Sequence, residues 1–107
     1  MRILIDKCID ERLRNCVPGH DCRTAHYAGL AGLSNGELLA AAEAAGFDVL
    51  LTVDQGIQYE QNLQGRKIAI VVLPVKSNRL KDLLLHMESC LACLDSRRPG
   101  EVVRIGD

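Results

Sequence analysis

The sequence contains few aromatic residues. They make up 3% of its 107 residues and include one Phe and no Trp. The core must therefore be built from Leu, Ile, Val and Ala, and the shortage of aromatic residues argues against an extended platform on which bases stack, as in single-strand-binding proteins. An excess of one charge is also missing, because 13 Lys and Arg residues stand against 14 Asp and Glu residues. With a net charge of −1, no global positive field attracts RNA, DNA or an anionic membrane, so any nucleic-acid binding must be local.

Long apolar runs are absent as well. The longest cover residues 68–73 and 38–42, far short of the roughly 18 residues that a membrane span needs. The N-terminus reaches Asp6 after a three-residue apolar run, which is too short for the core of about 7–15 residues in a secretory signal. We therefore expect one domain over residues 1–107, located in the cytoplasm and without a membrane partner.

The cysteines are expected to be reduced. There are five of them, an odd number in a chain without an export signal, which argues against a disulfide framework. His86, Cys90 and Cys93 follow one another at i, i+4 and i+7, a spacing that invites a redox or zinc interpretation. A redox pair belongs near the start of a helix, and a zinc site needs a further ligand. We therefore predict that these residues pack in the core.

Strand and helix patterns alternate along the chain. Aliphatic runs predict strands, whereas apolar residues at helical spacing and capping signals predict helices. Strands are expected at residues 2–5, 20–25, 48–54, 67–74 and 101–105, helices at 10–16, at 34–46 and from Ser77 onward, a loop at 26–33, and a short irregular or helical stretch at 59–63. The last helix is expected to be long, with one apolar face formed by Leu80, Leu83, Leu84, Met87, Leu91 and Leu94. Arg12 and Arg14 are expected to face solvent.

This alternation predicts an α/β fold with three layers, in which helices cover both faces of a mostly parallel central sheet. Ser34 and Glu37 have the spacing of a capping box at the start of the second helix, and Gly46 ends that helix. In open parallel sheets, binding sites form outside the carboxyl ends of the strands.

Three carboxylates are expected near that edge of the sheet. Asp6 and Asp54 each follow an apolar strand, and Glu37 opens the helix that leads into the second of these strands. Carboxylates brought together repel one another unless a cation lies between them, and Mg²⁺ or Mn²⁺ is the natural occupant. Such a cation can activate water and stabilise charge on a phosphodiester. The pattern therefore predicts metal-dependent phosphodiester cleavage, with these three acids as metal-binding and catalytic residues.

Each acid also has a structural interpretation. Asp6 can cap the helix that follows it, and Asp54 can begin a turn before Gln55. Glu37 can complete the capping box with Ser34. Acids at strand ends are common in α/β folds without being catalytic, so the pattern alone leaves both interpretations open.

The order of these residues resembles that of the small stand-alone PIN-like domains, which are relatives of the PIN-domain ribonuclease toxins. The resemblance covers nearly the whole chain and rests on RILID at residues 2–6, GLAGLSNGELL at 29–39 and VLLTVD at 49–54. In that family the first aspartate, the glutamate at the helix start and the aspartate after the third strand bind the metal. The resemblance therefore implies a PIN-like fold and a metal-dependent ribonuclease toxin in which Asp6, Glu37 and Asp54 hold Mg²⁺ or Mn²⁺. RNA is then the substrate and an antitoxin protein the partner.

Two positions depart from the family's pattern. The family usually has an acid directly after the first aspartate, where this chain has Lys7, whose ammonium either weakens cation binding or binds a phosphate. PIN nucleases often carry a fourth acid beyond the fourth strand, where this chain has Lys76, Asn78 and Arg79. We predict that Lys7, Lys76, Asn78 and Arg79 bind phosphates of the substrate. The alternative for the last three is an ordinary charged helix start.

Two further functions fit parts of the pattern. A PIN-like domain that has lost catalysis would bind a protein partner through residues 29–33 or the final helix, and Lys7 and the missing fourth acid favour this alternative. A receiver domain would use Asp54 as a phosphoacceptor, but Lys7 breaks the acid pair that receivers have after the first strand, and Glu37 would have no role. The leucine-rich final helix would also suit a homodimer.

Overall fold

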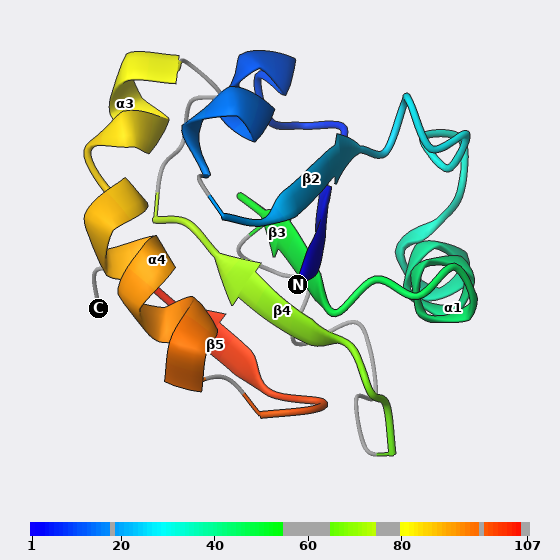
Figure 1. Cartoon of the computed structure of the whole chain (residues 1–107). Helices are drawn as coiled ribbons and strands as arrows, with labels where there is room; N and C mark the ends of the chain where they lie inside the picture. The colour runs from blue at the N-terminus through cyan, green and yellow to red at the C-terminus, as the bar shows by residue number, and fades with distance from the viewer. Residues whose placement is uncertain (18, 55–64, 75–79, 97, 106–107) are drawn as a thin grey trace.

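The centre of the molecule is a five-stranded sheet (Figure 1). The computed structural model describes residues 1–17, 19–54, 65–74, 80–96 and 98–105. The strands are β1 (Arg2–Ile5), β2 (Asp21–Thr24), β3 (Val49–Thr52), β4 (Ala69–Val72) and β5 (Val102–Arg104). They lie in the order β2-β1-β3-β4-β5, and every neighbouring pair is parallel. The predicted α/β class and all five predicted strands are confirmed, and the described sheet is wholly parallel.

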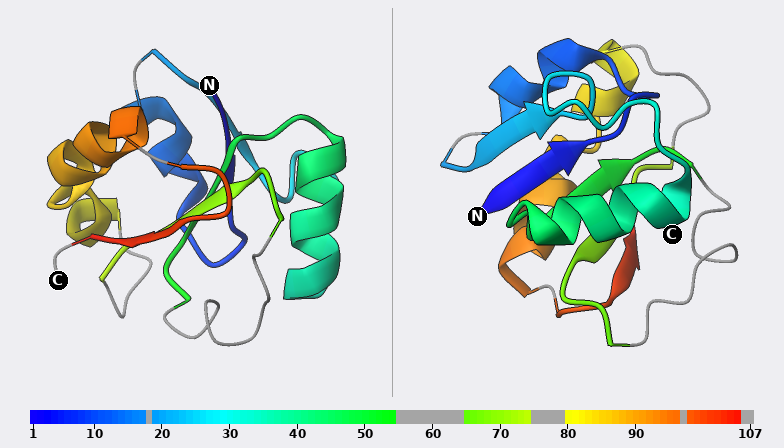
Figure 2. Two further views of the ribbon diagram at one scale, coloured as in Figure 1. Left: turned by 90° about the horizontal axis from the view of Figure 1, so that it is seen from below. Right: turned by 90° about the vertical axis from the view of Figure 1, so that its right-hand side faces the viewer.

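Helices cover both faces of this sheet, which gives three layers (Figure 2). The helices are η1 (Glu11–Cys16, a 3₁₀-helix), α1 (Asn35–Ala44), α3 (Leu80–Leu84) and α4 (Met87–Ser96). α1 lies on one face, and η1, α3 and α4 lie on the other (Figures 1 and 2). Because side chains alternate along a strand, Ile3 and Ile5 pack beneath η1 and α4, whereas Leu4 packs against α1. Strands buried on both faces require continuous apolar runs, as the sequence has.

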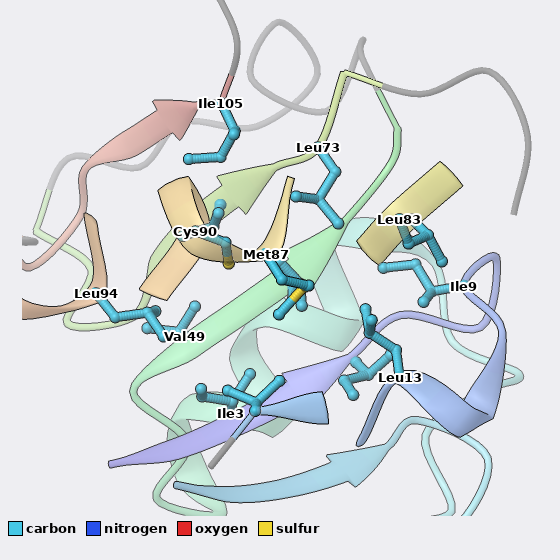
Figure 3. Close-up of a cluster of buried hydrophobic side chains, with 14 of the residues drawn as sticks. Ile3, Ile9, Leu13, Val49, Leu73, Leu83, Met87, Cys90, Leu94 and Ile105 are labelled. Carbon is cyan, nitrogen blue, oxygen red and sulfur yellow. The ribbon is translucent and has the colours of Figure 1, made fainter. Parts of the chain in front are cut away.

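The larger core lies between the sheet and the layer of η1, α3 and α4 (Figure 3). Leu83, Met87, Cys90 and Leu94 project from α3 and α4 onto the strands, and each is at most 6% exposed. The core position predicted for Cys90 is therefore confirmed. Cys93 is half-buried and packs against the same cluster, whereas His86 is half-buried and does not belong to it.

The prediction of one long C-terminal helix is wrong, because the structure describes two helices there, α3 and α4. The chain breaks between α3 and α4, where the backbone N–H of His86 donates to the Leu83 carbonyl at 3.1 Å. Leu84 follows the buried Leu83 and is turned by about 100° around the helix axis, so it is 44% exposed instead of lying on the apolar face. The predicted helix start at Ser77 and the stretch at residues 59–63 lie outside the described residues. No helix in the described part of the chain is long and apolar enough to cross a membrane.

The end of α1 ties this helix to β1. Gly46 has a φ of +85°, and its N–H donates to the Glu43 carbonyl while the Phe47 N–H donates to the Ala42 carbonyl, both at 3.0 Å. This is the Schellman ending that favours glycine. Arg2 lies over it, with its guanidinium carbon 4.5 Å from the centroid of the Phe47 ring. The predicted helix end at Gly46 is confirmed.

The replacement Gly46→Ala tests this ending. A residue with a side chain loses about 1–2 kcal/mol in the left-handed region, and the new Cβ would lie 3.0 Å from Nη1 of Arg2. We expect a loss of at least this size in the free energy of unfolding, measured by urea denaturation. Gly29 also has a positive φ, but nothing lies within 4 Å of its added Cβ. Gly29→Ala should therefore lower the free energy of unfolding by less than Gly46→Ala. Gly32→Ala, without positive φ or neighbour, should be nearly neutral, and a Gly46→Ala protein as stable as this control would contradict the argument.

Candidate functional site

Two of the predicted acids meet where β1 and β3 end side by side. Asp6 follows β1, and Asp54 lies just beyond β3. The Asp6 N–H donates to the Leu51 carbonyl at 2.9 Å, which extends the pairing of the two strands. The strand order reverses here, because the chain passes from β1 to β2 on one side and later to β3 on the other. Ligands of open α/β sheets bind in the crevice at this kind of switch point.

The hydroxyl of Thr52 positions both acids. Thr52 ends β3 and is fully buried. Its Oγ1 donates to Asp6 Oδ2 at 2.7 Å and accepts a hydrogen bond from the Asp54 N–H at 3.1 Å. Thr52 is not among the site residues predicted from the sequence, although a lone hydroxyl in a buried aliphatic strand is a signal, since it must find a partner there.

Asp6 is held from two sides. Its side chain is buried, with 6% of the residue exposed, and the Lys7 N–H donates to the second oxygen, Oδ1, at 2.8 Å. A carboxylate has about four acceptor positions, so these two hydrogen bonds leave room for a further contact. Asp6 does not cap η1, because Asp10 does so by accepting the N–H of Arg12. Hydrogen bonds from Arg12 lower the pKa of Asp10 to about 2.

Asp6 and Lys7 line two pockets at this edge of the sheet. One has a volume of about 440 Å³ and is lined by Asp6, Lys7, Cys8, Leu33, Ser34 and Asp54. The other has a volume of about 310 Å³ and is lined by Asp6, Lys7, Ile9, Glu11, Thr24, His26 and Ala31. We call them the Asp54 pocket and the His26 pocket. Lys7 is exposed, so a ligand in either pocket can reach its ammonium.

Glu37 stands apart from the other two acids. It is exposed in the first turn of α1, and its Oε1 accepts a hydrogen bond from the Ser34 hydroxyl at 2.9 Å. Ser34 is the N-cap residue, but its side chain does not accept a backbone N–H, so the predicted capping box is only half formed. Glu37 lines neither pocket. Within the described residues, no three His, Cys, Asp or Glu side chains are grouped so that they could hold a metal ion.

Of the four residues predicted to bind phosphate, the structure describes one. Lys7 lies beside Asp6 as expected, whereas Lys76, Asn78 and Arg79 fall outside the residues that the structure describes. Cys8 adds a neutral wall to the Asp54 pocket. Burial raises the pKa of its thiol, the charge of Asp6 raises it further, and a hydrogen bond from the Val53 backbone opposes the shift. At neutral pH Cys8 is therefore a thiol, which is a poor nucleophile.

The role of Thr52 is tested by comparing Thr52→Val with Thr52→Ser. Valine keeps the shape but leaves a buried carboxylate oxygen and the Asp54 N–H without the hydroxyl, and we expect a loss of about 2–4 kcal/mol in the free energy of unfolding. Serine keeps the hydroxyl and lacks one methyl group, so its loss should be about 1 kcal/mol. Urea denaturation measures both. If the valine protein is as stable as the serine protein, the hydroxyl does not hold the two acids.

The chain matches no family model, no curated protein and no solved structure in comparisons with known proteins. The chemistry of the two pockets is therefore inferred from their own residues. The features that carry it are the paired acids Asp6 and Asp54, the buried hydroxyl of Thr52 and the exposed ammonium of Lys7.

Proposed function

We propose that this protein is a PIN-like, metal-dependent ribonuclease whose reaction takes place at Asp6 and Asp54. The observation that carries the proposal is that these two acids line one pocket of about 440 Å³ at the switch point between β1 and β3. Two carboxylates, a hydroxyl at Ser34 and an ammonium at Lys7 make this pocket suited to a cation and a phosphate together.

The residues fit a divalent cation that keeps part of its water. Mg²⁺ is usually held in proteins by one or two carboxylates with waters completing its shell, and Asp6 and Asp54 provide two. Glu37 does not line the pocket, so we propose that it contributes as a ligand only after its hydrogen bond with Ser34 is exchanged. When bound, Mg²⁺ or Mn²⁺ would supply a Lewis acid that neutralises charge developing on the phosphoryl group.

The protein's own residues have distinct roles in this proposal. Thr52 and the Lys7 N–H keep the Asp6 carboxylate facing the pocket, because each occupies one of its oxygens. Asp54 accepts a proton from the water that attacks the phosphodiester, while the P–O bond to the leaving ribose oxygen breaks and that oxygen takes a proton from solvent water. The ammonium of Lys7 binds a non-bridging phosphate oxygen. Lys76, Asn78 and Arg79 follow β4 in the chain and are proposed to bind phosphates of the same RNA.

A different function is favoured by other observations. The exposed Lys7 beside Asp6, and Glu37 bonded to Ser34, both weaken a cation site. Leu84 and Leu85 are 44% and 79% exposed at the break between α3 and α4, and a protein partner would bury them. The second candidate is therefore a PIN-like interaction module without catalysis, whose partner is an antitoxin-like protein or a second copy of this chain.

A receiver domain, the third alternative, is compatible with the observed strand order. The order β2-β1-β3-β4-β5 is one of the common doubly wound arrangements, and it is used by more than one family. A receiver needs an acid pair after its first strand and a lysine after its last. In this chain Lys7 follows Asp6 and breaks the acid pair, and Glu37 would have no role in a receiver. We therefore rank this alternative last, and labelling of Asp54 by acetyl phosphate would be needed to revive it.

Thermal unfolding with divalent cations tests the metal site. A ligand that binds only the folded state at ten times its dissociation constant stabilises by about 1.4 kcal/mol, which raises the Tm of a domain of this size by roughly 5–10 °C. We expect millimolar Mn²⁺ to produce such a shift in the natural protein and not in Asp54→Asn. Asp95→Asn is the matched control, because Asp95 is an exposed residue of α4 that lines neither the Asp54 pocket nor the His26 pocket.

Cleavage of single-stranded RNA in Mn²⁺ then separates the candidates. A Tm shift and cleavage that are both lost in Asp54→Asn would support the nuclease. No shift and no cleavage would leave the interaction module in its place. Glu37→Gln shows whether Glu37 binds the cation, because a Tm shift equal to that of the natural protein would remove it from the ligand set.

A further inference from the structure

A third pocket lies beside the edge strand β2, away from the two acids. It has a volume of about 260 Å³ and is lined by Arg14, Asp21, Cys22, Arg23 and Tyr27. β2 is the outermost strand on this side of the sheet (Figure 1), and Arg14 comes from η1 beside it. Neither the proposed reaction nor the predicted phosphate contacts use any of these residues.

Tyr27 is the notable side chain of this pocket. It is 67% exposed, whereas Phe47, the other aromatic residue in the described part of the chain, is buried. The guanidinium carbon of Arg23 lies 5.5 Å from the centroid of the Tyr27 ring. An exposed aromatic ring beside an Arg plane is the kind of surface on which proteins stack the unpaired bases of RNA.

The pocket also carries an excess of positive charge. Asp21 faces two guanidinium groups, with its Oδ1 3.3 Å from Nε of Arg23 and its Oδ2 3.6 Å from Nε of Arg2. Arg14 lines the same pocket and makes no ion pair with another described residue. Ion pairs this exposed contribute little, so Arg23 can exchange Asp21 for a phosphate. In a chain with a net charge of −1, such a local positive surface is what binding to nucleic acid requires.

This surface adjoins the His26 pocket. Glu11 lines the His26 pocket, and Arg14 lines the third pocket. These two residues are neighbours on η1, because residues three apart in a 3₁₀-helix lie on the same side. Residues at the end of β2 also line both pockets. Thr24 and His26 line the His26 pocket, and Arg23 and Tyr27 line the third pocket. An RNA strand that leaves Asp6 and crosses the His26 pocket therefore reaches Tyr27.

We propose that Arg14, Arg23 and Tyr27 bind single-stranded RNA next to the nucleotide held at Asp6, with the two arginines contacting phosphates and Tyr27 stacking on a base. This inference rests on the proposed function, because it names the path of the same substrate. A protein strand is a poorer occupant of this edge, since the charged side chains of Asp21 and Arg23 oppose the pairing of β2 with another strand.

RNA binding without cleavage tests the inference. The probe is a mixed-sequence single-stranded RNA of about 12 nucleotides with a fluorescent label at its 5′ end, a length within the roughly 4–16 nucleotides that small single-strand-binding domains cover. Its fluorescence anisotropy is measured with the full chain in EDTA, so that no metal-dependent cleavage occurs. We expect the Kd to rise at least about five-fold in Tyr27→Ala, in line with the loss of base stacking, and to rise as well in Arg14→Gln and Arg23→Gln. Removing one phosphate contact should also reduce the slope of log Kd against log salt by about 0.7.

Two variants serve as controls. Tyr27→Phe keeps the ring and should bind as the natural protein does. Arg98→Gln removes the same charge from an exposed residue that precedes β5, at the opposite edge of the sheet, and should change the Kd by less than about two-fold. Urea denaturation of each variant shows that it is folded.

The outcomes separate this inference from the proposed nuclease. Binding that depends on these residues supports the inference, even if the natural protein does not cleave RNA in Mn²⁺ and the nuclease proposal falls. Cleavage by the natural protein with unchanged binding in Tyr27→Ala, Arg14→Gln and Arg23→Gln overturns the inference and leaves the nuclease intact. Absence of RNA binding by the natural protein also overturns it, as does a dimer that Tyr27→Ala converts to a monomer, because the surface would then join two copies of the chain.

Discussion

The hydrogen bond between the Thr52 hydroxyl and the Asp6 carboxylate connects the fold with the candidate site. A carboxylate that is 6% exposed has lost most of its water, and that loss is tolerated only where hydrogen bonds replace it. Thr52 can supply one because β3 lies directly beside β1 and ends at the same edge. The same oxygen of Thr52 accepts the Asp54 N–H. The pairing of these two strands therefore sets the position of both acids.

The core is aliphatic, because the chain has few aromatic residues, and it lies on both faces of the sheet. Aliphatic side chains are small, so the chain needs many of them, and two separate cores on the two faces of one sheet accommodate them. The crossover helices that connect parallel strands cover both faces of such a sheet. A parallel sheet gathers the carboxyl ends of its strands at one edge, and the order β2-β1-β3-β4-β5 leaves a crevice there. The parallel pairing of the strands thus sets both the position of the two cores and the edge at which the site lies.

The sequence predicts β1, β3 and β4 well because each is an aliphatic run with clear ends, whereas β2 is a more polar strand with the sequence DCRT. It also predicts the end of α1, since Gly46 favours the left-handed backbone found there. The break after Leu84 could not be predicted, because apolar residues continue at helical spacing on both sides of it. At the site, the strand ends indicate that Asp6 and Asp54 lie at one edge, and their register then brings them to one pocket. The hydrogen bond of Glu37 with Ser34 depends on how α1 begins, and the pattern of residues fits both this bond and a metal ligand.

The distribution of charge around the sheet edge suits a polyanion more than the net charge suggests. Asp6 and Asp54 place two negative charges in one pocket, and Lys7 offsets one of them, so a single divalent cation would make the pocket positive. Beyond Lys7, the third pocket, beside β2, is lined by two arginines, Arg14 and Arg23, and by one aspartate, Asp21. Once a cation is bound, a phosphate chain following this path meets positive charge at both ends, with Glu11 as the one acid besides Asp6 among the described residues that line the His26 pocket. An overall charge of −1 therefore does not oppose RNA binding, because exposed charges more than about 10 Å apart are largely screened from one another at physiological salt.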